Sequence, residues 1–207
     1  DYGQLGNGGY SNLNTPTLSS SLGTGRTAVA LSSGQYHTCA ILDNGSVSCW
    51  GSGGYGRLGN GATSTKLTPT LTSSLGTGRT AVALSSGGDH TCAILDNGSV
   101  SCWGSGGYGK LGNGGNSSNK LTPTLTSSLG TTTNPRTAAL SERDFDNDGI
   151  MNIFDTHANL DYQENTLSSG TGHTCAILDN GSVSCWGYGI KGQLGNGGTS
   201  IKTTPTL

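Results

Sequence analysis

The chain has 207 residues, of which 37 are glycine, while only 31% are hydrophobic and 6% aromatic. Because about 45–50% of an ordinary globular domain is apolar, this composition excludes a large helical core. The charge is low and balanced, with 10 Lys and Arg against 12 Asp and Glu, which argues against a disordered chain and against a nucleic-acid binder. The sequence has no long apolar run and no basic-then-apolar start, so we expect neither a membrane span nor a signal peptide in it.

Tandem repetition organises the whole chain. The string HTCAILDNGSVSCWG begins at three histidines, His37, His90 and His173. A second string, LGNG followed by a polar run and TPTL, begins at four leucines, Leu5, Leu58, Leu111 and Leu194. Successive copies of either string are 53 residues apart, except that the last copy of each follows after 83, because about 30 residues are inserted before it. A fixed period of this kind indicates a repeat architecture.

Each copy of the first string predicts a β-hairpin, since two short runs of strand-forming residues flank Asp-Asn-Gly. A three-residue loop with Gly45 in the left-handed conformation pairs Leu42 with Ser46 and, further out, Cys39 with Cys49. The two cysteines then face each other as a non-hydrogen-bonded pair, with about 4.5 Å between Cα atoms, which suits a disulfide. A two-residue turn would put the two sulfurs on opposite faces. We therefore favour the first register, and we apply it to the other pairs, Cys92 with Cys102 and Cys175 with Cys185.

The alternative interpretation of the cysteines is a metal site in which His37 joins Cys39 and Cys49. The spacing contains no CxxC and supplies no fourth ligand, so three local disulfides are favoured. Regular disulfides form in oxidising compartments. We therefore expect an extracellular or cell-surface location.

Two further strands are expected in each unit, one at TAVALSSG before the hairpin and a weaker one at TPTL after it. Three or four short antiparallel strands in each unit are typical of a propeller blade, and one blade alone has too little apolar surface to be stable. The predicted fold class is therefore all-β, with propeller-type repeats at residues 1–140 and 165–207 and an insertion at 141–164.

The phrase GxxHTCAILDNGSVSCWGxGxYGRLGNG resembles the repeat of the regulator of chromosome condensation family. Members of this family form seven-bladed β-propellers, and they include a chromatin-bound nucleotide exchange factor, secreted bacterial proteins and a β-lactamase inhibitor. Seven such units would need about 371 residues, so we expect an incomplete or open array here. Three readings are open: an excerpt of a longer propeller, a subunit that closes with other copies, and an array that polymerises.

The resemblance implies that the repeated histidines are structural hydrogen-bonding groups that contact a neighbouring loop. We also expect the tryptophans Trp50, Trp103 and Trp186 to pack between blades. No serine lies in a nucleophile elbow, no triad order can be read, and the glycines around Tyr55 and Tyr108 precede no helix. We therefore predict no catalytic residue, no dinucleotide site and no enzymatic activity.

The insertion predicts a calcium site. Its order DFDNDGIMNIFD places oxygen ligands at positions 1, 3, 5, 7, 9 and 12 of a twelve-residue loop, with Gly149 at the bend. The ligands are Asp144, Asp146, Asp148, Ile150 through its carbonyl, Asn152 and Asp155. Three carboxylates this close repel one another unless a cation lies among them. The segment resembles the calcium loops of dockerins and thrombospondin type 3 repeats, and the alternative is a solvated acidic surface loop.

The units differ mainly in predicted loops, where binding surfaces usually lie: Tyr36 is not repeated, and Arg57 becomes Lys110 and then Gln193. The near-identity of the units favours a secreted, non-catalytic structural or adhesive protein that self-assembles into a filament or surface layer and is stabilised by disulfides and calcium. The alternative is a module that recognises another extracellular protein, or inhibits it, through one rim. A third hypothesis is a catalytic domain elsewhere in a longer precursor.

Overall fold

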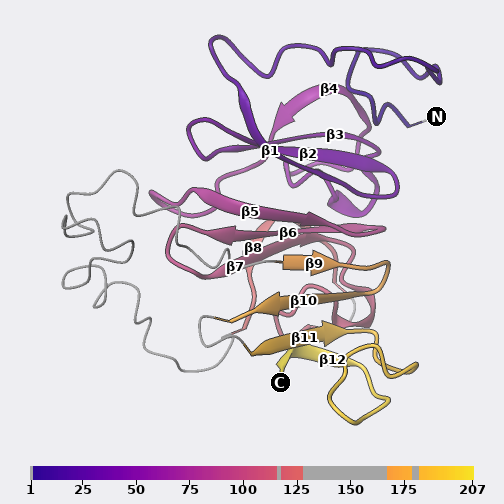
Figure 1. Cartoon of the computed structure of the whole chain (residues 1–207), viewed down its shortest axis with the longest axis vertical. Helices are drawn as coiled ribbons and strands as arrows, with labels where there is room; N and C mark the ends of the chain where they lie inside the picture. The colour runs from indigo at the N-terminus through magenta and orange to yellow at the C-terminus, as the bar shows by residue number, and fades with distance from the viewer. Residues whose placement is uncertain (1, 116–117, 128–166, 179–181) are drawn as a thin grey trace, which may run out of the picture.

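The computed structural model describes residues 2–115, 118–127, 167–178 and 182–207. These residues form three antiparallel four-stranded sheets, here called blades, that lie one after another along the molecule (Figure 1). Blade 1 comprises β1 (Ala28–Ser33), β2 (His37–Leu42), β3 (Val47–Gly51) and β4 (Lys66–Leu71). Blade 2 comprises β5 (Ala81–Ser86), β6 (His90–Leu95), β7 (Val100–Gly104) and β8 (Lys120–Leu125). Blade 3 comprises β9 (Leu167–Ser169), β10 (His173–Ile177), β11 (Val183–Gly187) and β12 (Lys202–Thr206).

The hairpin between β2 and β3 has the predicted three-residue loop. The backbone N–H of Leu42 donates to the carbonyl of Ser46 at 2.9 Å, and Gly45 has a φ of +74°, in the left-handed region. Cys39 therefore lies opposite Cys49 in the register. A side chain at Gly45 would also overlap Thr80, so this glycine allows the turn to contact the start of blade 2.

The cysteine pairs expected from this register are disulfide-bonded in all three blades: Cys39 with Cys49, Cys92 with Cys102, and Cys175 with Cys185. The Cα atoms of each pair are 4.1 Å apart, close to the separation of a non-hydrogen-bonded pair. The described residues contain no free cysteine.

The hydrophobic core lies between blades. Each hairpin has a back face, which in blades 1 and 2 packs against the following blade, and an opposite front face, which packs against the preceding unit. In blade 1 the back face comprises Cys39, Ile41, Val47 and Cys49, which form one cluster with Ala93, Leu95 and Trp103 of blade 2. The back face of blade 2 packs in the same way against Ala176 and Trp186 of blade 3. Both clusters thus contain residues of two neighbouring blades.

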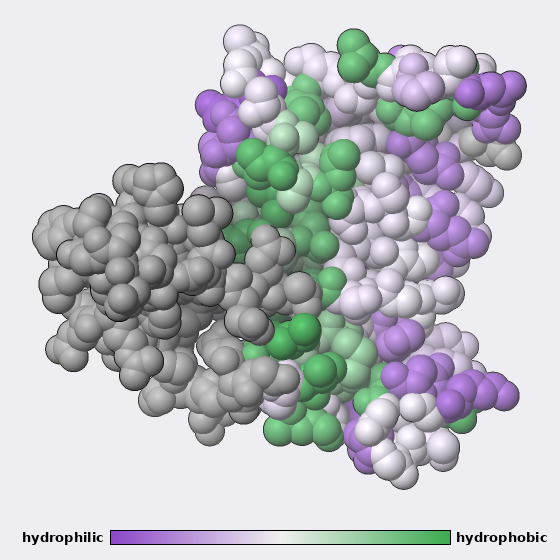
Figure 2. All heavy atoms as spheres, in the orientation of Figure 1, coloured by the Kyte–Doolittle hydropathy of each residue, from purple (hydrophilic) through white to green (hydrophobic). Residues whose placement is uncertain are grey.

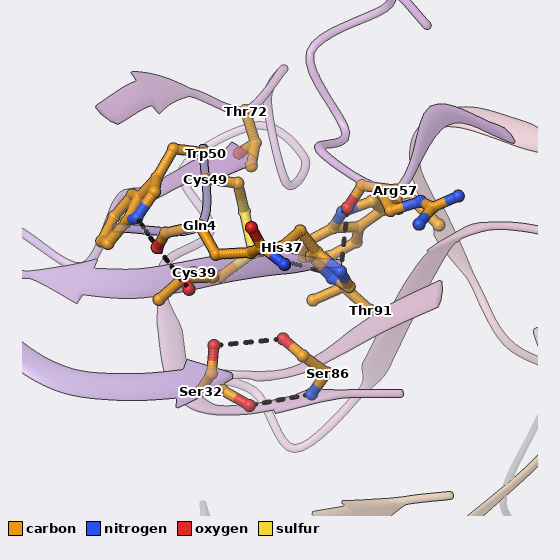
Figure 3. Close-up of a disulfide and its surroundings, with 12 residues drawn as sticks. Gln4, Ser32, His37, Cys39, Cys49, Trp50, Arg57, Thr72, Ser86 and Thr91 are labelled. Atoms are coloured by element: carbon orange, nitrogen blue, oxygen red, sulfur yellow. Dashed lines mark hydrogen bonds between the residues drawn. A yellow bond between two sulfur atoms is a disulfide. The ribbon is translucent and has the colours of Figure 1, made fainter. Parts of the chain in front are cut away.

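Neighbouring blades are also joined through one backbone carbonyl. The carbonyl of Arg57 accepts hydrogen bonds from Trp103 Nε1 at 3.0 Å and from the Thr91 hydroxyl at 3.1 Å. The Thr91 oxygen lies 2.7 Å from His37 Nε2 (Figure 3). Because the threonine proton points to the carbonyl, His37 must donate from Nε2. The partner of this histidine is thus a strand residue of the next blade, and not a loop as expected.

A backbone carbonyl that accepts from an indole and a threonine hydroxyl of the next unit is here called the joint, and it occurs ahead of each of the three blades. Between blades 2 and 3 the carbonyl of Lys110 accepts from Trp186 at 3.0 Å and from Thr174 at 3.3 Å, while His90 Nε2 lies 2.8 Å from the Thr174 hydroxyl. Ahead of blade 1, the carbonyl of Gln4 accepts from Trp50 at 2.7 Å (Figure 3). It also accepts from the Thr38 hydroxyl at 3.0 Å.

Glycine in the LGNG string is required by the joint. A Cβ added at Gly59 would lie 2.8 Å from Trp103 Nε1, because the indole packs directly on the backbone there. The φ of Gly59 is +67°, a conformation that most side chains disfavour. Gly59 is therefore required for two reasons: the tryptophan leaves no room for a side chain, and the backbone has a positive φ.

The molecular surface is divided by hydropathy. In Figure 2 apolar residues run from the first blade to the third next to the grey atoms, and hydrophilic residues lie mainly along the right-hand edge, with a further group at the upper left. The exposed apolar side chains include Val29 and Leu31 on β1 and Val82 on β5. Within the described ranges no helix is long and apolar enough to cross a membrane.

The buried histidines make stability depend on pH. Burial, together with the positive charge of Arg57, lowers the pKa of His37 to about 3, and burial with Lys110 does the same for His90. The Nδ1 atoms of both rings are buried without a hydrogen-bond partner, so the folded state keeps the rings neutral. In the unfolded chain both histidines titrate near pH 6.5.

We therefore expect the free energy of unfolding to be largest above about pH 6.5 and to fall as the pH falls below it, because the unfolded state then binds more protons. Between pH 7 and pH 5 the loss is about 2 kcal/mol for each histidine. Urea unfolding followed by tryptophan fluorescence, with the disulfides intact, measures it. The variant His37→Gln/His90→Gln keeps a donor near Nε2 but does not titrate, so its loss over this interval should be much smaller. Equal losses in both proteins would contradict this role of the histidines.

Candidate functional site

The third blade presents an unfilled copy of the surface that joins the blades. In blades 1 and 2 the back-face residues Ile41, Val47, Ile94 and Val100 are at most 2% exposed. Their counterparts on blade 3, Ile177 and Val183, are 38% and 52% exposed. The difference arises because no further blade follows among the described residues.

Two glycines after blade 3 also lack the neighbouring atoms that their equivalents have in the earlier units. A Cβ added at Gly6 or Gly112 would lie 2.7 Å from a tryptophan Nε1, and one at Gly59 would lie 2.8 Å away. At Gly195, the equivalent position after blade 3, nothing lies within 4 Å. Gly192 is equally open, whereas the equivalent glycines contact the next unit. We call this surface the open back face; it comprises His173, Cys175, Ile177, Val183, Gly192 and Gly195.

A second candidate surface is a row of aromatic and charged side chains on one rim. The loop between β1 and β2 and the loop after β3 lie at the same end of blade 1, because the strands are antiparallel. There the guanidinium of Arg57 lies 5.1 Å from the ring centre of Tyr36 and 5.6 Å from that of Tyr55. Its Nη2 atom is 3.0 Å from Asp89 Oδ1, and Tyr36 makes an edge contact with Tyr2 at 5.2 Å between centroids.

The row continues across blades 2 and 3. The ammonium group of Lys110 lies 5.9 Å from the ring centre of Tyr108, which contacts Tyr188 edge-on at 4.9 Å. Burial lowers the pKa of Lys110, and the nearby carboxylate of Asp89 opposes that shift. Asp89 thus interacts with the cations of two units. We call this set the rim row: Tyr2, Tyr36, Tyr55, Arg57, Asp89, Tyr108, Lys110 and Tyr188.

Two tyrosines of the rim row have an unusual backbone. Tyr55 and Tyr108 have φ values of +60° and +62° within the short helices η1 (Gly54–Gly56) and η2 (Gly107–Gly109). The left-handed region is costly for a bulky side chain, and such strain tends to occur at functional positions. Both side chains are nevertheless 52% exposed, so their own burial does not account for the conformation.

The structure brings together the loop positions that vary between units, since Tyr36, Arg57, Asp89 and Lys110 all lie in the rim row. Sequence reasoning missed the joint, the stacking of the cations on tyrosine and the left-handed tyrosines. The available signal was the repeated Tyr-Gly-x-Leu-Gly, in which residue x supplies the carbonyl of the joint and, as Arg57 and Lys110, also the cation of the rim.

The predicted calcium ligands, from Asp144 to Asp155, lie outside the described residues. Among the residues that are described, no group of three or more His, Cys, Asp or Glu side chains could hold a metal ion. In blades 1 and 2 the repeated histidines bind the threonines of the next blade, and the repeated cysteines form the disulfides.

Known proteins share both the sequence and the fold. The human E3 ubiquitin-protein ligase HERC2 is 30% identical over 231 residues, which cover 100% of this chain and 5% of the ligase. The ultraviolet-B receptor UVR8 of Arabidopsis thaliana is 29% identical over 203 residues, which cover 87% of this chain and 46% of the receptor. The chain thus spans less than half the length of either relative.

Among solved structures, Prp20p of Saccharomyces cerevisiae matches with a TM-score of 0.62 and 16% identity over 86% of this chain and 37% of its own. Human WBSCR16 matches with a TM-score of 0.54 and 19% identity over 99% of this chain and 59% of its own. At these identities the likeness concerns the fold alone.

Models of the regulator of chromosome condensation (RCC1) repeat match residues 1–41, 44–94 and 97–140, and a second model of the repeat also matches 28–57, 81–110 and 166–193. These matches include all three disulfide-bonded hairpins and both described joints between blades. The chain therefore belongs to the family of regulator of chromosome condensation repeats, and its three sheets are propeller blades of that family.

Proposed function

We propose that this chain is a non-catalytic structural or adhesive element that acts outside the cell or at its surface and associates with itself through its blade faces. The observation that carries the proposal is the near-identity of the units, whose back-face residues recur in all three hairpins. Apolar blade surface left in water favours association. A contact between two different faces leads to rings or to filaments, depending on whether the rotation between copies closes.

The disulfides support the extracellular part of the proposal. Each bridge closes a loop of ten residues, and such a bridge contributes about 2–3 kcal/mol to the stability. That contribution matters in a chain of which only 31% is hydrophobic, and it would be lost in the reducing cytosol. Protein taken from its source with six thiols that react with maleimide would contradict this location.

Self-association is tested by sedimentation velocity of the disulfide-bonded chain over a range of protein concentrations. We expect the mass to rise from 20.8 kDa to multiples of it as the concentration increases, because the open back face is covered in the assembly. A single species of 20.8 kDa at all concentrations would contradict the proposal.

The second candidate function is recognition of another extracellular protein through the rim row. Arg57 is buried, at 5% exposure, beneath exposed tyrosines, and tyrosine and arginine are enriched in protein-binding hot spots. Among structures with the same fold, yeast RCC1 has been solved bound to Kap60, and Prp20p is described with its binding to Gsp1p and histones. The observation that favours this candidate is the strained backbone of the exposed Tyr55 and Tyr108.

The variant Tyr55→Gly/Tyr108→Gly separates the two candidates, because glycine suits the left-handed backbone while the rings are lost. If the rim row holds a partner, the variant should lose a discrete protein that the wild type captures from its native surroundings. Self-association through the blade faces should be unchanged. Capture of the same protein by both would contradict recognition through the rim row.

Calcium binding by residues 144–155 is the third part of the proposal, and it is supported by the spacing of oxygen ligands in the sequence. We expect isothermal titration to show one calcium ion for each chain. Asp148→Ala should weaken binding about tenfold or more, since it removes a charged ligand. The control Asp161→Ala lies in the same insertion but at no ligand position, so its affinity should match the wild type. Equal affinities of all three proteins would exclude this loop as the site.

A further inference from the structure

We propose that the ammonium group of Lys110 binds a carboxylate of the partner protein, an Asp or Glu side chain that enters beside Tyr108 and Tyr188 where blades 2 and 3 meet. This inference rests on the second candidate function, recognition of a protein through the rim row, and names the chemical group that is recognised. Tyr108 and Lys110 follow β7 of blade 2 and Tyr188 follows β11 of blade 3, so the site lies between two blades that the structure describes.

The boundary between blades 1 and 2 shows what a cation at this position requires. Arg57 follows blade 1 and is buried, and its Nη2 atom lies 3.0 Å from Asp89 Oδ1, a carboxylate that blade 2 supplies. Its Nε atom donates to the carbonyl of Gly54 at 2.9 Å. A buried charge is costly unless it is paired and hydrogen-bonded. The carboxylate of the next blade is therefore part of the site.

The boundary between blades 2 and 3 has the cation but lacks the carboxylate. Lys110 stands where Arg57 stands in the first unit, and it is equally buried. The residue of blade 3 equivalent to Asp89 is Gly172, one residue before the repeated histidine. The backbones agree, because the N–H of the second residue after the tryptophan donates to the carbonyl of Asp89 in blade 2 and to that of Gly172 in blade 3, both at 2.8 Å. Position 172 thus has the place of the carboxylate but no side chain.

No carboxylate of the described residues takes over this role. None of the ion pairs in this part of the chain involves Lys110, and its ammonium group makes no hydrogen bond there. Burial lowers the pKa of Lys110 and the charge of Asp89 opposes that shift, but the carboxylate of Asp89 is already paired with Arg57. Among the described side chains, the enclosed polar atoms without a partner are the Nδ1 atoms of two histidines, so the ammonium group still reaches solvent. A group of a partner protein can therefore approach it.

Two tyrosine rings line the site. The ammonium group of Lys110 lies 5.9 Å from the ring centre of Tyr108, which meets Tyr188 edge-on at 4.9 Å between centroids. A Cβ added at Gly187, next to Tyr188, would lie 3.3 Å from the Cα atom of Lys110. The other two units have serine at the place of Tyr188, so among the three units this ring occurs only where the carboxylate is missing. Apolar rings beside the cation strengthen its attraction for an anion, and they offer a surface for the methylene groups of an Asp or Glu side chain.

The charge of the site selects a carboxylate over a phosphate. The rim row holds two cations, Arg57 and Lys110, against the single carboxylate of Asp89. One added carboxylate therefore balances it, whereas a doubly charged phosphate would leave a negative charge unpaired close to Asp89. The pair of Arg57 and Asp89 is a carboxylate in the equivalent position of the first boundary.

The first test titrates the disulfide-bonded chain with N-acetylglutamate methylamide, which carries one carboxylate, and with the uncharged N-acetylglutamine methylamide. Nuclear magnetic resonance follows the side-chain signals of Lys110, Tyr108 and Tyr188. We expect only the glutamate probe to shift them. Lys110→Gln keeps the backbone carbonyl of the joint but loses the charge, so the glutamate probe should bind it about tenfold or more weakly.

The matched control is Arg79→Gln, which removes one positive charge beside Asp96 at the opposite end of blade 2 and should bind the glutamate probe like the wild type. Equal binding of the probe by Lys110→Gln and the wild type would overturn the inference. Inorganic phosphate is titrated in the same way. If phosphate binds more tightly than the glutamate probe, the assignment of a carboxylate is wrong.

A second pair of variants tests whether position 172 faces the ammonium group. Gly172→Asp supplies from within the chain the carboxylate that Asp89 supplies to Arg57, so we expect it to exclude the glutamate probe and to raise the pKa of Lys110. Gly172→Ala adds the same Cβ, 3.2 Å from the Cβ atom of Tyr188, without the charge. The affinity for the probe should be lower in Gly172→Asp than in Gly172→Ala by about tenfold or more. Equal affinities would contradict the site.

Failure of this inference is distinguishable from failure of recognition through the rim row. If Tyr55→Gly/Tyr108→Gly loses a captured protein and Lys110→Gln retains it, the rim row holds a partner but the carboxylate pair is wrong. If the tyrosine variant retains every captured protein, recognition through the rim row is itself wrong. Loss of the same protein from the tyrosine variant, Lys110→Gln and Gly172→Asp, with retention by Gly172→Ala, is the result that we expect.

Discussion

One backbone carbonyl in each unit, bound by an indole and a threonine hydroxyl of the next unit, holds this protein together. The carbonyl belongs to residue x of Tyr-Gly-x-Leu-Gly, and the glycine after the leucine must lack a side chain so that the tryptophan can pack on the backbone. Gln4, Arg57 and Lys110 supply this carbonyl in turn. Their side chains are unrelated, because the joint uses only the backbone of this position. The side chains are therefore free to vary on the rim.

The joint explains how a chain with so few apolar residues forms a core. Each blade contributes a small back face and a small front face, and neither is buried until another unit covers it. The disulfide lies in the back face, where it takes part in the packing and also fixes the hairpin register. Burial, covalent linkage and hydrogen bonding thus meet at the same boundary. An uncovered boundary leaves the burial and the hydrogen bonding incomplete, whereas the disulfide still forms. This is why blade 3 differs from blades 1 and 2 in exposure although the sequences of their hairpins are the same.

The fold was predictable from local patterns, but the joint was not. Asp-Asn-Gly with cysteines ten residues apart determines the strand register, because only one register puts both sulfurs on one face. Repetition then indicates blades. His37 and Thr91, by contrast, are 54 residues apart, and nothing in the spacing of either residue identifies the other. The left-handed conformation of Tyr55 was also hidden, since its neighbours are glycines to which a positive φ would ordinarily be assigned. The rim row depends on the packing of the blades at the joint, so it could not be predicted from the sequence either.

The carbonyl joint governs the burial of each tryptophan. The most direct test of this dependence is the rate of hydrogen exchange at the three indole N–H groups, measured by nuclear magnetic resonance. Trp103 and Trp186 are each held between two blades, whereas Trp50 is covered by residues 2–9 and Leu22 and by no preceding blade among the described residues. At a protein concentration at which the chain is monomeric, the account predicts slow exchange for Trp103 and Trp186 and clearly faster exchange for Trp50. Equal exchange at all three indoles, or fastest exchange at Trp103, would contradict it.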